Sequence, residues 1–169
     1  MGRLKNIILA KILTRFPSLL DRIVEKTKKT EVSGIPWAPV RKRLSGSKVA
    51  IVTTAGVHLR SQTAFDMHDP DGDPTWRELP LSTPGDGYTI THDYYDHADA
   101  DRDLNIVFPI DRLKEMKEAG IIGAISEVNF GFMGHIDGPH VETLIKKTAP
   151  EIAKRLKTEE VDVVLLTPG

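Results

Sequence analysis

The sequence predicts an α/β fold, a three-layer domain with a mainly parallel sheet, preceded by an N-terminal amphipathic helix. Short, nearly all-apolar β-branched runs at 49–54 and 161–166 are typical of strands buried on both faces of a parallel sheet. Helical apolar stripes lie between such runs, so strands and helices alternate along the chain. We expect residues 1–30 to contain the N-terminal helix and 48–169 to form the α/β domain, with 31–47 as the connector between them.

The N-terminal helix is predicted from the apolar side chains that recur at helical spacing over 3–27, with Arg and Lys between them. Pro17 would kink this helix, or end it before a second helix begins at Ser18. We expect the helix to pack on its own domain or on a neighbouring subunit. A peripheral membrane helix is the alternative, because it also has a basic polar face.

The α/β domain begins with the 49–54 strand, which runs into a glycine-containing loop that carries His58. Residues 61–90 look irregular, and a loop of that length inside a compact domain tends to be functional. Thr148 and Glu151 have the spacing of a capping box, so the last helical stretch should kink or restart there. The other expected elements are a short strand or a helix approach at 104–108, a helix at 110–119, a strand within 121–130, a helix that starts at Pro139 and is interrupted at Pro150, and a last strand at 161–166.

Composition and charge narrow the class of protein. The chain has no cysteine, so it contains no disulfide, no thiolate zinc site and no cysteine nucleophile. No apolar run approaches the roughly 20 residues of a membrane span, and no secretory signal is evident, so we expect a cytoplasmic protein. Residues 1–48 hold 12 Lys/Arg against 3 Asp/Glu, and 49–111 hold 3 against 12. These parts could pair within a chain or between subunits; nucleic-acid binding is not expected, because the basic part lacks a recognition motif.

The highest density of chemically active side chains lies at 91–101, Thr-His-Asp-Tyr-Tyr-Asp-His-Ala-Asp-Ala-Asp. Two further histidines follow expected strands in glycine-containing turns, where an open α/β sheet binds its ligands. We therefore predict a site with these catalytic candidates: His58, His92, Asp93, Asp96 and His135.

Three interpretations of these residues stay open. Histidine titrates near neutral pH and an adjacent carboxylate fixes its tautomer, which suits general acid/base catalysis. The same groups could ligate a divalent metal, although the spacing of His92 and His97 is not that of the helical zinc motif. The structural alternative is an acidic loop whose Asp residues make turns and caps, with His58 fixing its loop by hydrogen bonds.

Several segments resemble the selenoprotein B family of the glycine, sarcosine, betaine and D-proline reductases. The resemblance covers roughly residues 35–169, and the short format is most similar to the D-proline reductase subunit. The segments that carry it are Ile35-Pro36-Trp37-Ala38-Pro39, Val49–Leu59, Gly72-Asp73-Pro74, Thr91-His92-Asp93-Tyr94-Tyr95-Asp96, Asn105–Pro109 and Phe132-Met133-Gly134-His135.

The resemblance implies reductive cleavage of a carbon–nitrogen bond of a small amine or amino acid with electrons from a dithiol. It also implies a selenocysteine or cysteine nucleophile just after the 161–166 strand, and a partner subunit that carries a pyruvoyl group. Because this chain has no cysteine and Gly169 lies about where the nucleophile is due, we expect a selenocysteine, encoded by UGA, after Gly169. The α/β domain would then be incomplete at its C-terminus; a different stop codon in the downstream DNA would contradict this hypothesis.

Two other classes of function stay open from the sequence. The chain could be a non-catalytic binding or scaffold subunit whose acidic middle pairs with a basic surface. It could also be a metal-dependent hydrolase that uses the His/Asp cluster. The substrate is not specified by these residues, and the apolar N-terminal helix makes a homo-oligomer plausible.

Overall fold

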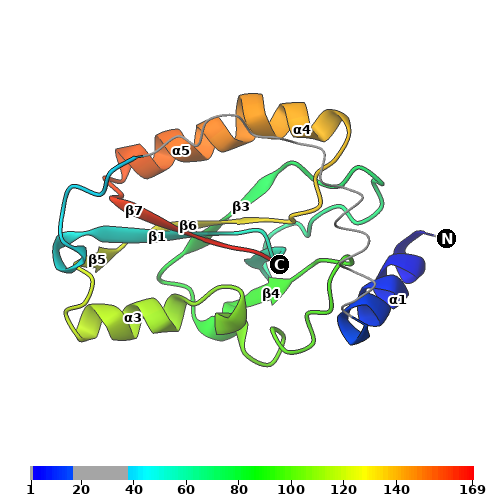
Figure 1. Ribbon diagram of the computed structural model, residues 1–169, viewed down its shortest axis with the longest axis horizontal. Coiled ribbons are helices and arrows are strands. Elements are labelled where there is room, and N and C mark those ends of the chain that lie inside the picture. The colour runs from blue at the N-terminus through cyan, green and yellow to red at the C-terminus, as the bar shows by residue number, and fades with distance from the viewer. Residues whose placement is uncertain (1, 17–37) are drawn as a thin grey trace.

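The computed structural model describes residues 2–16 and 38–169, which fold into an N-terminal helix and a three-layer α/β domain (Figure 1). The main sheet is built from β1 (Lys48–Thr53), β3 (Trp76–Pro80), β5 (Ala124–Ile125), β6 (Val128–Phe132) and β7 (Val163–Thr167). A separate antiparallel pair is formed by β2 (Val57–Leu59) and β4 (Tyr88–Ile90). The predicted fold class is confirmed.

Strand β1 is the centre of the main sheet. Along one edge it pairs in parallel with the whole of β7, from Val49–Val163 to Thr53–Thr167. Along the other edge it pairs in parallel first with β5 and then with β6. The sheet ends beyond β6 with β3, which is antiparallel. The carboxyl ends of β1, β6 and β7 therefore meet at one edge of the sheet.

Asn129 bonds backbone groups of the sheet at the point where β5 ends and β6 begins. Its side chain is fully buried, and its Oδ1 accepts a hydrogen bond from the Ile51 backbone N–H at 2.8 Å. Its Nδ2 donates to the Leu79 and Ser126 carbonyl oxygens, both at 3.3 Å. One amide side chain thus satisfies buried backbone groups of the two strands flanking β6 and of the β5–β6 break, which would otherwise be costly.

Helices cover both faces of the sheet (Figure 1). One face is covered by α3 (Ile110–Glu118), which lies where the sequence predicts a helix at 110–119 and is followed by Gly120 with a positive φ of 70°. The other face is covered by α4 (Pro139–Thr143) and α5 (Ala149–Thr158), joined by the π-helical segment η4 (Leu144–Thr148). Short 3-10 turns complete the set: η1 (Leu44–Gly46), η2 (Gly85–Gly87) and η3 (Leu104–Ile106).

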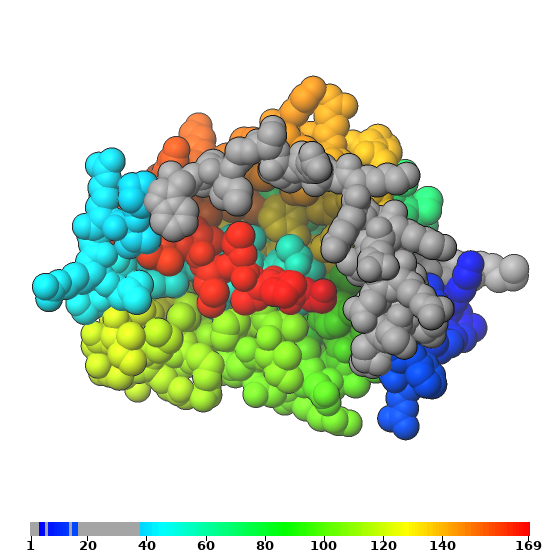
Figure 2. Space-filling model, viewed as in Figure 1, coloured from blue at the N-terminus to red at the C-terminus, as the bar shows by residue number. Residues whose placement is uncertain are grey.

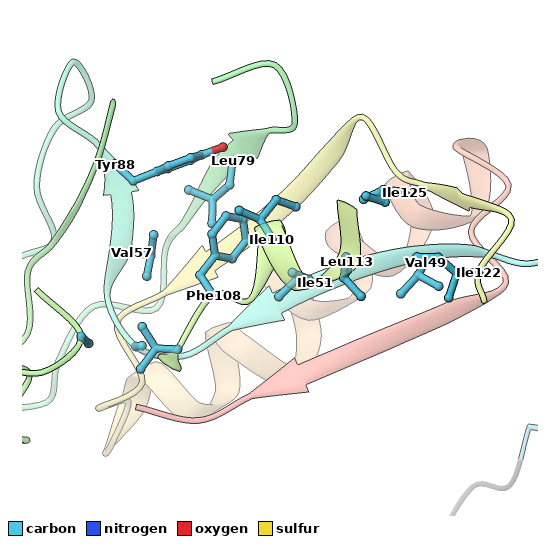
Figure 3. Packing of buried hydrophobic residues seen from close by; sticks show 13 residues of the cluster. Val49, Ile51, Val57, Leu79, Tyr88, Phe108, Ile110, Leu113, Ile122 and Ile125 are labelled. Atoms are coloured by element: carbon cyan, nitrogen blue, oxygen red, sulfur yellow. The ribbon is translucent and has the colours of Figure 1, made fainter. Parts of the chain in front are cut away.

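The side chains of β1 alternate between two apolar clusters, as expected for a strand with both faces covered. Val49 and Ile51 point into the cluster on the α3 side, which also contains Phe108 and Leu113 (Figure 3). Ala50 and Val52 belong to the opposite cluster, with members from β6 and α5. Each large apolar side chain buried this way stabilises the fold by roughly 1.5–3 kcal/mol.

Two predictions about the domain's elements are wrong. Residues 61–90 are not irregular throughout, because β3 and β4 lie there; a mixed run such as Trp76–Pro80, at the sheet's edge, gives a weak strand signal. The capping box at Thr148 is absent, because its side chain makes no cap hydrogen bond. The restart expected at that point is observed, since α5 begins at Ala149 after the π-helical segment, one residue before Pro150.

Helix α1 (Gly2–Arg15) confirms the first half of the predicted N-terminal helix. The predicted break at Pro17, the rest of the 3–27 helix and the 31–37 part of the connector lie outside the described residues. Ala10 is buried, whereas much of the helix's apolar surface is exposed. Within 2–16 and 38–169, every helix is too short or too polar to cross a membrane.

Candidate functional site

The candidate site is the edge of the sheet where the parallel strands β1, β6 and β7 end. Three short segments leave the sheet there, namely 54–56, 133–135 and 168–169. In open α/β sheets this carboxyl edge is where ligands bind. Figure 2 shows the C-terminal residues, in red, on the visible face between the orange α5 region and the green α3 region.

The 91–101 segment is fixed to this edge by a close backbone contact. Thr91 N–H donates to the Gly56 carbonyl oxygen at 2.9 Å, and Gly56 has a positive φ of 74°. A Cβ on Gly56 would lie 2.3 Å from the Thr91 carbonyl oxygen, so only glycine permits this approach. The Tyr95 hydroxyl donates to the Ala55 carbonyl oxygen at 3.1 Å. These contacts hold the predicted acidic segment against the end of β1.

The end of β7 reaches the same place. Gly169 packs so closely that a Cβ on it would lie 2.5 Å from Ala55 Cα and 3.1 Å from Tyr95 Cε1. The Thr167 hydroxyl donates to the Val107 carbonyl oxygen at 2.6 Å, which ties β7 to the turn before α3. The structure therefore brings β7 and the 91–101 segment together.

His92 is a buried ring at this edge, with 7% of its surface exposed. Tyr94 N–H donates to His92 Nδ1 at 3.0 Å, and the rings of Tyr94 and Tyr95 meet it edge-on at 5.9 and 4.7 Å. Burial, assisted by the nearby His97 and His135, lowers the pKa of His92 to about 4. The imidazole is therefore uncharged at neutral pH.

His135 comes to the site from the turn after β6. Its ring stacks on Tyr94, with centroids 4.0 Å apart and 21° between the planes. His135 Nε2 donates to the Pro70 carbonyl oxygen at 3.0 Å, which holds the ring in that orientation. Two of the predicted histidines, His92 and His135, thus flank one tyrosine although they are far apart in sequence.

The predicted carboxylates lie on the side of the segment that faces α1. Asp93 is buried, with 5% exposed, whereas Asp96 is exposed and accepts a hydrogen bond from Ala98 N–H at 3.3 Å. Both line a cavity of about 190 Å³ together with His92, Tyr95 and His97, and α1 contributes Ile7 and Lys11 to its wall. This small cavity is therefore acidic on the side of the 91–101 segment, whereas α1 contributes one aliphatic side chain and one lysine.

His58 occupies a different environment. It lies in β2, buried, where its Nδ1 donates to the Leu59 carbonyl oxygen and its Nε2 accepts from the Thr91 hydroxyl, both at 2.8 Å. Burial lowers the pKa of this ring, which favours its uncharged form. The Nδ1 bond lies within β2, and the Nε2 bond ties β2 to Thr91, directly after β4. Because both nitrogens are bonded, the structural alternative for His58 is favoured; its catalytic role stays a prediction.

Sequence reasoning missed three residues that shape this edge. Thr54 is exposed at the end of β1, Gly134 approaches it with a φ of 90°, and Lys11 of α1 lines the acidic cavity. A glycine two residues after a strand is a weak signal, and no sequence pattern links α1 to residues 93–101. Within 2–16 and 38–169, no three His, Asp or Glu side chains converge in a way that could hold a metal ion.

The fold is an α/β domain whose candidate site, lined by histidines and aspartates, lies at the carboxyl ends of its parallel strands. The model of the family described as glycine/sarcosine/betaine reductase selenoprotein B matches residues 19–169. The chain belongs to this family.

Curated relatives agree with this membership. D-proline reductase subunit gamma of Acetoanaerobium sticklandii is 39% identical over 133 residues, which are 79% of this chain and 53% of that protein. Glycine reductase complex component B subunit gamma of Symbiobacterium thermophilum is 34% identical over 143 residues, 79% of this chain and 31% of that protein. Betaine reductase complex component B subunit beta of Peptoclostridium acidaminophilum is 29% identical over 153 residues, 85% of this chain and 32% of that protein.

The chain spans about half the length of the first of these relatives, and about a third of the other two. No solved structure matches it.

Proposed function

We propose that this chain forms one wall of the active site of a reductase that cleaves a C–N bond of an amino acid or related amine with dithiol electrons. The observation that best supports this proposal is that Gly169, Ala55 and the 91–101 segment lie in contact at the carboxyl edge of the sheet. Family membership supports the reductase class. The names of the relatives supply the substrates to test: glycine, sarcosine, betaine and D-proline.

The position of the end of β7 fits the nucleophile that the family resemblance implies. A residue placed after Gly169 would leave the sheet beside Tyr95, whose ring meets that of His92. A selenolate or thiolate there would supply the nucleophile, and a pyruvoyl group on a partner subunit would activate the amine. In this proposal, the protein's own residues bind and orient the substrate between the two.

The charge of the wall suits an amine. Asp93 and Asp96 face a small cavity, and carboxylates attract the ammonium of an amino acid or a secondary amine. The stacked Tyr94 and His135 rings lie outside this cavity, next to His92, where they would offer a flat, rigid surface to the aliphatic part of a substrate. Lys11 is placed to contact a carboxylate at the α1 side of the same cavity.

The test is turnover by the whole protein. The full-length protein, carrying selenocysteine or cysteine at the implied position, would be assayed with its partner subunits, dithiothreitol and each of the four amines. The proposal expects dithiothreitol-dependent C–N cleavage of at least one amine, measured by mass spectrometry of the product, and none when the nucleophile is replaced by alanine. No turnover of any of them would favour a scaffold subunit.

A further inference from the structure

His92 has a fixed tautomer. A backbone N–H can only donate, so Tyr94 N–H at 3.0 Å requires a lone pair on His92 Nδ1. A neutral imidazole carries one proton, which must then sit on Nε2. His92 therefore presents an Nε2–H group and has no lone pair at that nitrogen.

This Nε2–H group faces the carboxyl edge of the sheet. A Cβ on Gly134 would lie 3.3 Å from His92 Nε2 and 2.3 Å from the Thr54 carbonyl oxygen, so Nε2 lies next to this glycine and a side chain at 134 would crowd it. Thr54 and Gly134 are both exposed. Among residues 2–16 and 38–169, no group accepts a hydrogen bond from His92 Nε2. A side chain more than nine-tenths buried thus holds one donor without a protein partner.

The ring stays uncharged in its surroundings. Burial opposes its protonation, and so does any positive charge on the histidines nearby. The titratable groups that face or flank it are Asp93, Tyr94, Tyr95, Asp96, His97, Asp101, His135 and Lys11. An uncharged imidazole leaves the negative field of the aspartates in place, so a ligand that carries an ammonium as well as an acceptor oxygen is favoured over a simple anion.

We propose that His92 serves this site as an uncharged hydrogen-bond donor, whose Nε2–H binds a carboxylate oxygen of a zwitterionic substrate, and not as a proton acceptor. Neutral imidazole is an effective donor to a substrate oxygen in enzyme sites. The identity of the ligand rests on the proposed function, whereas the state of the ring does not. Proton transfer in this site then belongs to groups other than His92.

The ring is tested by NMR on the 169-residue chain labelled with ¹⁵N-histidine. Long-range ¹H–¹⁵N spectra, assigned with His92→Gln and with His68→Gln as an exposed control, report which nitrogen carries the proton. We expect the neutral Nε2–H pattern for His92 between about pH 5.5 and about pH 8.5, while added N-acetylhistidine titrates near its ordinary pKa of about 6.5. A proton on Nδ1, or an imidazolium at neutral pH, would overturn the proposal.

The ligand is tested in the same spectra with glycine, acetate and methylamine. Glycine should move the His92 Nε2–H resonance at lower concentration than acetate, because only glycine also carries an ammonium, and methylamine should leave it unmoved. An equal response to methylamine, or no response to any of the three, would contradict carboxylate binding. None of these measurements needs turnover, so a failed reductase assay with a confirmed ring would reject the proposed function alone.

In the whole protein, the role is read from kinetics. His92→Phe should lower kcat/KM roughly 10- to 100-fold, the range for a lost hydrogen bond to a charged group. His92→Gln keeps an amide N–H at similar reach and should recover part of that loss, whereas His68→Gln should not change it. Equal losses in the Phe and Gln variants would show that donation is not the role of His92.

Discussion

Asn129 offers the sharpest test of how the sheet that carries the site is held together. Replacing it with alanine removes the acceptor at 2.8 Å from Ile51 N–H, and two donors at 3.3 Å from the Leu79 and Ser126 carbonyl oxygens. All four residues are buried. A buried N–H left without an acceptor costs about 1–3 kcal/mol, and the two longer bonds add roughly 0.5 kcal/mol each. We expect a loss of roughly 2–4 kcal/mol in the free energy of unfolding.

The loss is measured by urea unfolding followed by tryptophan fluorescence, since Trp76 packs edge-on against Phe130, next to Asn129. Asn129→Leu is the matched control, because leucine restores the volume but supplies no acceptor. Both variants should lose a similar amount at an unchanged m-value. A loss under about 1 kcal/mol in the alanine variant, or full recovery in the leucine variant, would refute the hydrogen-bond argument and assign the effect to packing.

Two further predictions concern the carboxyl edge. Gly134→Ala should lower the free energy of unfolding by roughly 2–3 kcal/mol, because φ is 90° and the new Cβ would lie 2.3 Å from the Thr54 carbonyl oxygen. The control is Gly46→Ala, which should be nearly neutral because nothing lies within 4 Å of a Cβ there. Equal effects of the two substitutions would contradict the close approach at Gly134. His92 should also make the fold less stable in acid. In the unfolded chain its ring takes up a proton below a pKa of about 6.5, whereas in the folded protein it does so only near pH 4. The free energy of unfolding should therefore fall by up to about 3 kcal/mol as the pH is lowered through this window. Urea unfolding at a series of pH values should show a smaller fall for His92→Phe, and identical slopes would show that the ring titrates normally.

The buried parts of the fold were predictable from the sequence because they follow simple periodicities. The β-branched run of β1 has helices on both faces, and the α3 helix ends at a glycine with positive φ. The edge strand β3 was not predictable, because its mixed sequence has no clear alternation. The π-helical turn before Pro150 was also missed, since a capping box and a continuing helix share the same residues at that point.

The candidate site was predictable in its composition and less so in its geometry. The high density of titratable side chains indicated the 91–101 segment, and its place after an expected strand indicated His135. In the structure, Tyr94 of that segment stacks on His135. The same reasoning could not tell that both nitrogens of His58 are bonded, or that Tyr94 N–H fixes the tautomer of His92. Such details depend on backbone positions that no local residue pattern encodes.

The central claim of the proposed function is that the 91–101 segment faces the position after Gly169, where the proposal places the nucleophile. Disulfide trapping tests it directly, in a full-length protein with cysteine at the implied nucleophile position and a second cysteine introduced at Tyr95, which lies against Gly169. The matched control introduces it at Glu118, exposed at the far end of α3. A disulfide forms only when Cβ atoms can approach to about 4 Å. Mass spectrometry after mild oxidation should find the cross-link for the Tyr95→Cys protein and not for Glu118→Cys; the reverse result, or equal trapping at both positions, would contradict the account.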